Sequence, residues 1–164
     1  MNSRERILAS LNHRQPDRVP VDLGASTVTG ISAIAYGNLK KVLGISRPTR
    51  VFDVVQQLAS IDMEVIDLFG VDVLDVSRVS AETGDWYEVE LSEGILVEYP
   101  HWYRPVRMPD GSWQTFDADG TLLSRMPAGA ACFDQMCFPY ENGYPGNFNN
   151  LRDALKKISW VIHS

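Results

Sequence analysis

Two short apolar runs, one on each side of a helical region, constrain the fold of this chain more than any other feature. The first is RVPVDLG, residues 18–24, and the second is VDVLDVSRV, residues 71–79. Both are rich in branched apolar residues, which is typical of strands buried in a sheet. Because helical segments separate them, we expect a parallel βαβ unit. Two parallel strands alone cannot cover both faces of a sheet, so the sequence indicates part of a larger fold.

Apolar residues at helical spacing predict five helices. The first can be capped by Asn2 or Ser3 and should end near His13. The second helix, over residues 31–43, would end at Gly44 as a C-terminal cap. The other helices are expected at residues 50–59 and 62–69, and from Asn149 or Asn150 almost to the C-terminus.

The sequence changes character after Ser80, where aromatic residues alternate with polar ones. Two Asp-Gly pairs, at 110–111 and 119–120, are strong signals for β-hairpins. We therefore expect an antiparallel meander within residues 81–126. Residues 1–80 would hold the first helix and the first two β/α units, and residues 127–164 a loop and the last helix. The predicted strands of the meander lie near 86–91, 95–99, 103–107, 112–116 and 121–125.

Composition excludes several classes of protein. The formal charge is −6 and no run of Lys or Arg offsets it, so nucleic acid is not an expected partner, since phosphate neutralisation drives most of that affinity. No apolar run approaches the roughly 18 residues of a membrane span, and the first residues lack the apolar segment of a signal peptide. We expect a cytoplasmic protein with no membrane partner.

Several stretches resemble a known family. RERILASLNHRQPDRVPVDLG, GISAIAYGNLKKVLGI, TRVFDVVQQLA and DLFGVDVLDV resemble the opening of the uroporphyrinogen decarboxylase superfamily. Within it, the similarity is to the branch of corrinoid- and zinc-dependent methyltransferases and their relatives. DGSWQTFDADGTLLSRMPAG is similar to an insertion in that branch.

The resemblance implies a (β/α)8 TIM barrel, a fold that takes roughly 250 residues. This chain would hold its N-terminal part: the first helix, two parallel barrel strands with their helices, and the inserted meander. Residues 127–164 would return to the barrel. The remaining strands would come from the same polypeptide or from a separate chain, because an open barrel edge favours a partner.

In such a barrel the reacting groups lie at the C-terminal ends of the strands. For the first strand this places Asp22, Gly24, Ser26 and Thr27 at the mouth. Asp22 could orient a substrate hydroxyl or act in acid-base chemistry, and Ser26 could help to bind a small-molecule substrate. The alternative is structural: Asp22 caps a backbone turn and the hydroxyls start the next helix.

Arg78 falls at the C-terminal end of the second predicted strand. Its guanidinium could hold a carboxylate or phosphate of the substrate through two parallel hydrogen bonds. The alternative is an ion pair with a carboxylate at the same end of the barrel, such as Asp22 or Asp75.

The sequence departs from the genuine decarboxylases of this superfamily. Those enzymes carry an arginine-rich stretch after the first strand that binds the substrate's carboxylates, whereas this chain has DLGASTVTG, without a cation. A substrate with several carboxylates would leave its anions unpaired, at several kcal/mol each. Decarboxylase activity is therefore only the third of our hypotheses.

Metal ligands of the methyltransferase branch come from later barrel strands, where His and Cys residues hold zinc. In this chain Cys132, Cys137 and His101 are the only candidates and none follows that pattern, so we expect no metal site here. The two cysteines are expected to be ordinary free thiols. DADGT, residues 117–121, mimics the start of a calcium loop but lacks its later oxygen ligands, so a hairpin turn is expected instead.

Aromatic residues are concentrated in the meander. They could line a pocket or a partner surface, but such residues more often form the packed face of a small sheet. The residues concerned are Trp86, Tyr87, Tyr99, Trp102, Tyr103, Trp113 and Phe116.

Two functions from different classes follow from these observations. The first is an enzyme part: the N-terminal portion or subunit of a methyltransferase-like barrel. The resemblance implies that its partner region binds zinc, which activates a substrate, and that a corrinoid protein takes part in methyl transfer. Asp22, Ser26 and Arg78 would position the substrate, and the catalytic set would not be complete in this chain. The second is a non-catalytic subunit or binding module that uses the meander as its binding surface.

Overall fold

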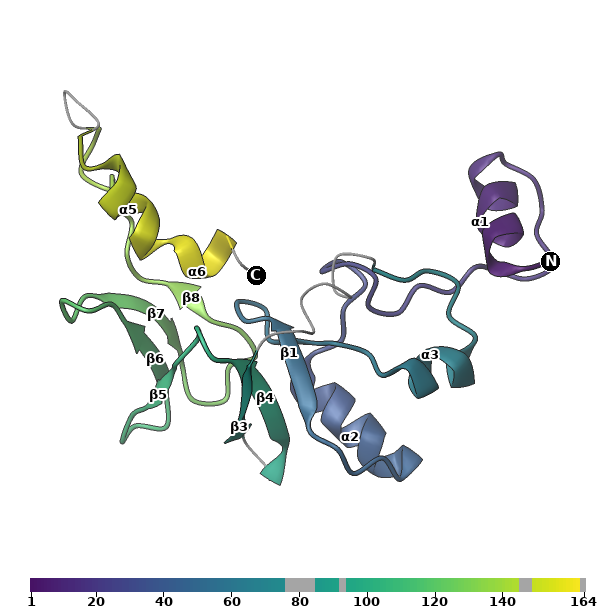
Figure 1. The fold of residues 1–164 in the computed structure, drawn as a ribbon, viewed down its shortest axis with the longest axis horizontal. Coiled ribbons are helices and arrows are strands. Elements are labelled where there is room, and N and C mark those ends of the chain that lie inside the picture. The colour runs from purple at the N-terminus through teal and green to yellow at the C-terminus, as the bar shows by residue number, and fades with distance from the viewer. Residues whose placement is uncertain (76–84, 92–93, 145–148, 163–164) are drawn as a thin grey trace.

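We describe a computed structural model that covers residues 1–75, 85–91, 94–144 and 149–162. The protein is a mixed α/β structure with two small four-stranded sheets and short helices (Figure 1). The described residues do not form a closed barrel. The second half of the predicted strand over 71–79 lies outside the described residues, and so does Arg78.

The first three helices confirm the sequence predictions, and their ends show why. Helix α1 (Ser3–Leu11) begins with a capping box, in which the Asn2 side chain accepts a hydrogen bond from the backbone of Glu5 and the Glu5 carboxylate accepts one from Asn2. Helix α2 (Ala33–Leu43) is followed by Gly44 at φ 74°. Helix α3 (Met63–Phe69) is followed by Gly70 at φ 58°. This left-handed backbone costs glycine little, so each glycine ends its helix.

The first sheet has the strand order β2–β1–β4–β3. Strand β1 pairs antiparallel with β2 and parallel with β4, which in turn pairs antiparallel with β3. The sheet therefore combines two strands from the N-terminal half with two strands of the predicted meander. The strands are β1 (Thr49–Asp53), β2 (Leu58–Ala59), β3 (Trp86–Glu90) and β4 (Leu96–Pro100).

The predicted helix over residues 50–59 is wrong, because these residues form the hairpin of β1 and β2. The Asp53 carboxylate accepts hydrogen bonds from the backbone N–H groups of Val55 and Gln56 at 2.9 and 2.8 Å and so closes the turn. Gln57 adopts φ 56°, which a helix does not allow.

The second sheet is an antiparallel meander with the order β5–β6–β7–β8. Both Asp-Gly pairs occupy the predicted hairpin turns, with Gly111 at φ 81° and Gly120 at φ 83°. Residues 117–121 thus form a turn, as predicted. The strands are β5 (Val106–Arg107), β6 (Trp113–Phe116), β7 (Leu122–Met126) and β8 (Asp134–Gln135).

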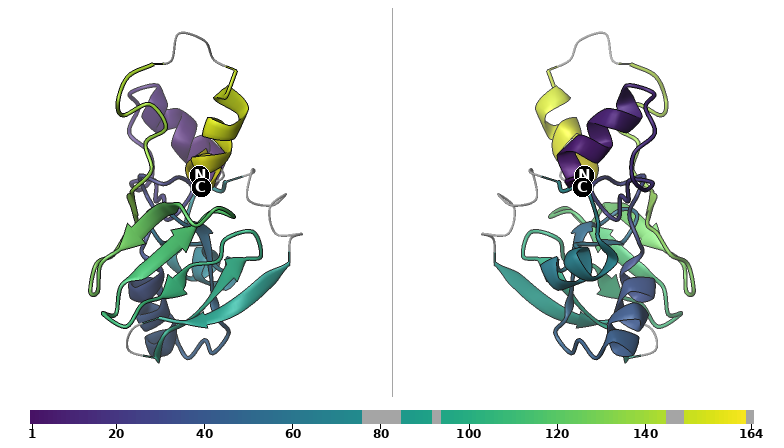
Figure 2. Two further views of the ribbon diagram at one scale, coloured as in Figure 1. Left: turned by 90° about the vertical axis from the view of Figure 1, so that its left-hand side faces the viewer. Right: turned by 90° about the vertical axis from the view of Figure 1, so that its right-hand side faces the viewer.

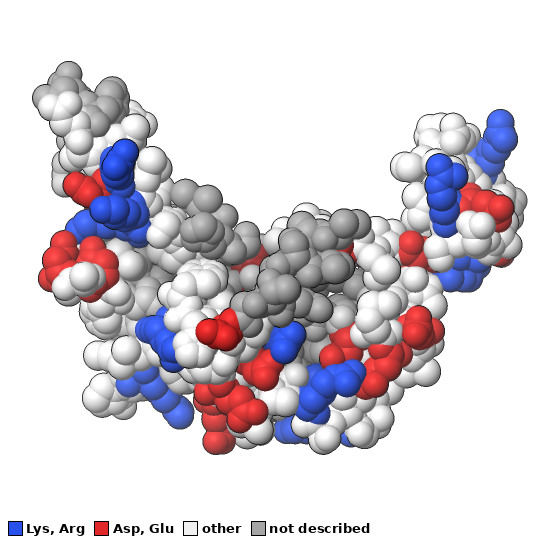
Figure 3. Space-filling model, in the orientation of Figure 1, with Lys and Arg blue, Asp and Glu red and all other residues white. Residues whose placement is uncertain are grey.

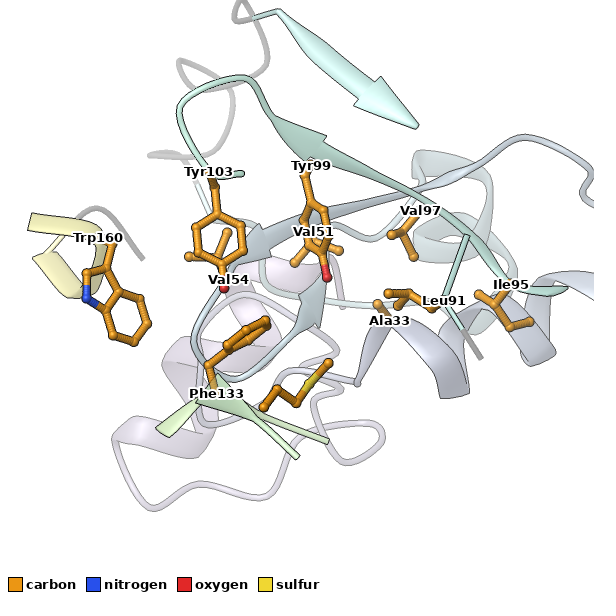
Figure 4. Close-up of a cluster of buried hydrophobic side chains, with 11 residues drawn as sticks. Ala33, Val51, Val54, Leu91, Ile95, Val97, Tyr99, Tyr103, Phe133 and Trp160 are labelled. Atoms are coloured by element: carbon orange, nitrogen blue, oxygen red, sulfur yellow. The ribbon is translucent and has the colours of Figure 1, made fainter. Parts of the chain in front are cut away.

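A single apolar core joins the two sheets. Val51 and Val97 come from neighbouring strands of the first sheet, and Tyr99, Tyr103 and Phe133 pack beside them (Figure 4). The Tyr103 ring meets the Phe133 ring edge to face, with centroids 5.6 Å apart. Since each of these side chains is at most 3% exposed, this core is the main source of hydrophobic stabilisation in the sheets.

Two helical arms project from the sheets. Helix α1 lies at one end of the molecule, and helix α5 (Leu151–Lys157) lies at the other, followed by α6 (Ser159–Ile162). The side views in Figure 2 show α1 and α5 on the same side of the sheets. The surface is hollowed between the two arms (Figure 3).

Within the described residues, neither 18–24 nor 71–75 forms a regular strand. Residues 19–22 and 71–75 run as open chain without helix, strand or turn, with bends at 18 and 23–24, and we call these two stretches the extended segments. One backbone hydrogen bond joins them, from Asp72 N–H to the carbonyl of Val21 at 2.7 Å. Pro20 has no N–H to donate. Among the described residues this is the only backbone hydrogen bond between the two segments, so they do not form a ladder.

Candidate functional site

The candidate site lies beside Asp72, where the two extended segments meet. Asp72 ties them together twice: its N–H donates to the Val21 carbonyl, and its carboxylate accepts the Val21 N–H at 2.9 Å. The residues that follow on each segment meet in a small pocket of about 90 Å³ beside α3. Its lining includes Gly24 and Ala25 from the first segment and Leu74 and Asp75 from the second. Residues 23–25 and 73–75 therefore lie at one pocket, while the end of the second predicted strand lies outside the described residues.

A cluster of charged residues fixes the start of both segments. The Arg6 guanidinium lies 2.7 Å from one oxygen of Asp17 and 2.5 Å from one oxygen of Asp72. Arg18 binds the other oxygen of Asp72 at 2.7 Å. The Asp72 side chain is fully shielded from solvent, and that of Arg6 is 8% exposed. We call these four residues the charge cluster.

The partners of the two carboxylates lower their pKa values. The backbone N–H of Val21, helped by Ser3, Arg18 and Arg6, holds the pKa of Asp72 well below its ordinary value despite desolvation. A hydrogen bond from Arg6 does the same for Asp17. Both groups are therefore ionised at neutral pH, and their role is to position the segments.

The predicted site residues make local contacts. One oxygen of the exposed Asp22 carboxylate accepts the Ala25 N–H at 3.0 Å. The Ser26 and Thr29 hydroxyls lie 3.1 Å apart, and each also accepts a backbone N–H of the other residue. These contacts belong to the loop between the first segment and α2. Asp22 and Ser26 thus lie on the loop that follows the first segment, while Arg78 lies outside the described residues.

Sequence reasoning missed a buried polar residue between the sheets. Gln57 is 4% exposed, and its amide nitrogen donates to the Val54 carbonyl at 2.6 Å while its amide oxygen accepts the Tyr99 hydroxyl. Its own carbonyl accepts the N–H of Ala33, the first residue of α2. A non-glycine residue at positive φ with a buried amide often marks a constrained site. No sequence pattern singles out this glutamine.

A second missed residue is Asp62, which gathers three donors from separate segments. The Tyr36 hydroxyl, the Lys40 ammonium and the Arg47 guanidinium contact its carboxylate at 2.8, 3.1 and 2.7 Å. Burial opposes ionisation, but these hydrogen bonds outweigh it and lower the pKa of Asp62. The sequence signal for this cluster was Lys40, a lysine on the apolar side of the predicted helix over residues 31–43. Because two of these donors lie on α2 and Asp62 directly precedes α3, the Asp62 carboxylate holds α2 against α3.

The described residues contain no group of three His, Cys, Asp or Glu side chains placed to hold a metal ion. Cys132 is exposed, Cys137 is partly buried and both are free thiols. Among the aromatic residues, Tyr99 and Tyr103 are buried in the core, whereas Trp102 and Phe116 are 49% and 44% exposed. The aromatic band therefore divides between the packed face and the surface.

Comparison with protein-family models, with curated proteins and with solved structures finds no match to this chain. Within the described part of the chain, none of the helices has the length and apolar character needed to cross a membrane.

Proposed function

We propose that this chain is the N-terminal part, or a subunit, of a methyltransferase-like (β/α)8 barrel related to the uroporphyrinogen decarboxylase superfamily. The observation that carries the proposal is the convergence of residues 23–25 and 73–75 on one pocket, with Asp72 joining the two segments. Neighbouring parallel barrel strands place their carboxyl ends at one rim in the same way.

Exposed apolar residues on the same half support this proposal. Val19 is 80% exposed, Val28 92% and Leu74 55%. Isolated exposed apolar residues are ordinary, but these belong to the two segments and the loop at the rim. In the proposed barrel, further strands would cover them and supply the hydrogen-bond ladder that the two segments lack.

The side-chain chemistry of Asp22, Ser26 and Arg78 suggests a role for each of them at the rim. Asp22 and Ser26 would orient a small-molecule substrate from the loop after the first strand, and Arg78 would hold an anionic group of that substrate. The described residues do not form a zinc site, so the proposal assigns any zinc ligands to the remaining strands. A corrinoid protein would be a separate partner.

Isolation from the native source tests the proposal most directly. We expect the chain to travel with a second polypeptide, or to be part of a longer one, and the complete assembly to contain zinc. Mass spectrometry and metal analysis of the purified material measure both. A folded, monomeric, metal-free chain would instead support the second hypothesis, a non-catalytic binding module.

In the complete assembly, Arg78→Ala should raise KM for an anionic substrate by about tenfold, because one charge-assisted hydrogen-bonded pair is lost. The zinc content should not change. Arg4→Ala is the matched control, because Arg4 is exposed on α1 and forms no ion pair within the described residues. Unchanged kinetics in Arg78→Ala would refute the role of Arg78.

A further inference from the structure

A cavity of about 210 Å³ lies between the two sheets, away from the rim. Helix α2 contributes its first turn, from Ser32 to Ile34, and the β1–β2 turn contributes Gln57. The β5–β6 hairpin contributes Arg107 and Trp113, and residues 126–131 close the remaining side. The cavity thus gathers segments from both sheets.

Its walls are mostly apolar. Ile34, Leu91, Trp113 and Met126 supply large side chains, and residues 127–131 supply only proline, alanine and glycine. An apolar cavity of about 150 Å³ is enough to hold benzene. The larger volume here, with one wall of small side chains, leaves room for a single aromatic ring and a short tail.

The cavity is formed in advance by contacts that do not need a ligand. Gln57 is held by Val54, Tyr99 and Ala33, as described above. On the opposite side, a Cβ at Gly111 would lie only 3.3 Å from the Ala128 methyl, so hairpin and loop pack closely there. A preformed pocket avoids the cost of ordering its walls on binding.

One cation stands at the edge of this cavity. Arg107 is exposed, and its guanidinium carbon lies 5.9 Å from the centre of the Trp113 ring. Elsewhere in the same hairpin, Asp110 is paired with Arg125 at 3.2 Å. Within the described ranges Arg107 has no carboxylate partner. An anion bound beside Trp113 would therefore meet an uncompensated positive charge.

We propose that this cavity binds a small aromatic carboxylate, with the ring against Trp113, Leu91 and Met126 and the carboxylate at Arg107. Apolar walls with a few polar groups that fix orientation are the ordinary composition of small-molecule sites. The site is separate from the rim, so it stands or falls independently of the proposed methyltransferase role.

The test is a titration of the chain, residues 1–164, with 3-phenylpropionate, followed by amide chemical shifts in NMR. We expect saturable shifts concentrated in residues 126–131 and around Trp113, and weaker binding of the neutral analogue 3-phenylpropan-1-ol. Absence of saturable shifts at these residues would overturn the proposal.

Two variants separate the parts of the site. Arg107→Gln should weaken binding of the carboxylate about fivefold, as expected for a partly solvated charge-assisted contact, and leave the alcohol unaffected. Arg152→Gln, an exposed arginine on α5, should change neither. Ala131→Phe should block both ligands by filling the cavity, whereas Ala118→Phe, at the exposed β6–β7 turn, should not. If Arg107→Gln and Ala131→Phe both bind like the wild type, the proposal is wrong.

Discussion

The sheet region and the N-terminal region of this molecule are held in place by different forces. In the sheets, Val97 and Tyr99 lie at most 1% exposed in a shared apolar core (Figure 4). In α1, the only buried residue is Arg6, while Leu8 and Leu11 are 41% and 71% exposed. The charge cluster, and not apolar packing, therefore fixes α1 against the extended segments.

This difference has consequences for stability. Hydrophobic burial is non-directional and depends little on pH. A network of ion pairs depends on the ionisation of every member, and removing one partner leaves another charge buried without compensation. We therefore expect α1 and the two extended segments to come apart under conditions in which the sheets remain folded.

Phe133→Ala should have the largest effect. Phe133 is 3% exposed and packs edge to face on Tyr103, so its loss should lower the free energy of unfolding by about 3–5 kcal/mol. Denaturant titration followed by tryptophan fluorescence measures this. The matched control is Phe138→Ala, at a residue that is 52% exposed, which should cost about 0.5 kcal/mol or less. Equal losses would show that the sheets do not depend on this core.

Arg6→Gln should have a smaller and local effect. The Asp72 carboxylate would keep Arg18 and the Val21 N–H but lose its Arg6 partner. Hydrogen exchange should increase within α1 and residues 17–22 and stay unchanged in β4 and β7. Arg4→Gln, on the exposed side of the same helix, is the control. An increase spread evenly over the sheets would contradict the division into two regions.

Lowering the pH should loosen α1 and residues 17–22 as well, with the smallest effect of the three changes. The pKa values of Asp17 and Asp72 are lowered in the folded protein, so their stabilisation is complete above the ordinary carboxyl pKa of about 3.9 and is lost as the pH falls through the lowered values. Amide shifts of α1, followed from pH 6 downward, should change before those of β4 and β7. Simultaneous loss in both regions would argue against a separate role for the charge cluster.

Local signals in the sequence predicted much of the fold. The helix cap at Asn2, the glycine after α2 and the two Asp-Gly turns each act within a few residues, and the structure confirms them. The hairpin at residues 49–59 was misassigned because its short apolar run fits a buried helix or a strand equally well. The local turn made by the Asp53 carboxylate decides between them, and the apolar run by itself does not reveal that turn.

Long-range pairing was not accessible in the same way. The parallel contact of β1 with β4 joins Thr49 to Val97, and no pattern in either segment specifies that partner. The same limit applies to the site. The sequence could place Asp22 and Ser26 after an apolar run, but it could not reveal that Asp72, Arg6 and Arg18 tie the run to its neighbour. Gln57 owes its position to contacts with Tyr99 and α2, which only the folded chain brings together.

The parallel pairing of β1 with β4 also bears on how this polypeptide matures during synthesis. When Thr49–Asp53 leaves the ribosome, its hairpin partner Leu58–Ala59 follows at once, but its other edge stays open until Leu96–Pro100 has been made. Through that interval an unpaired strand edge is available to other nascent chains. Chaperone contact is therefore expected to concentrate on translation intermediates that end between these two strands.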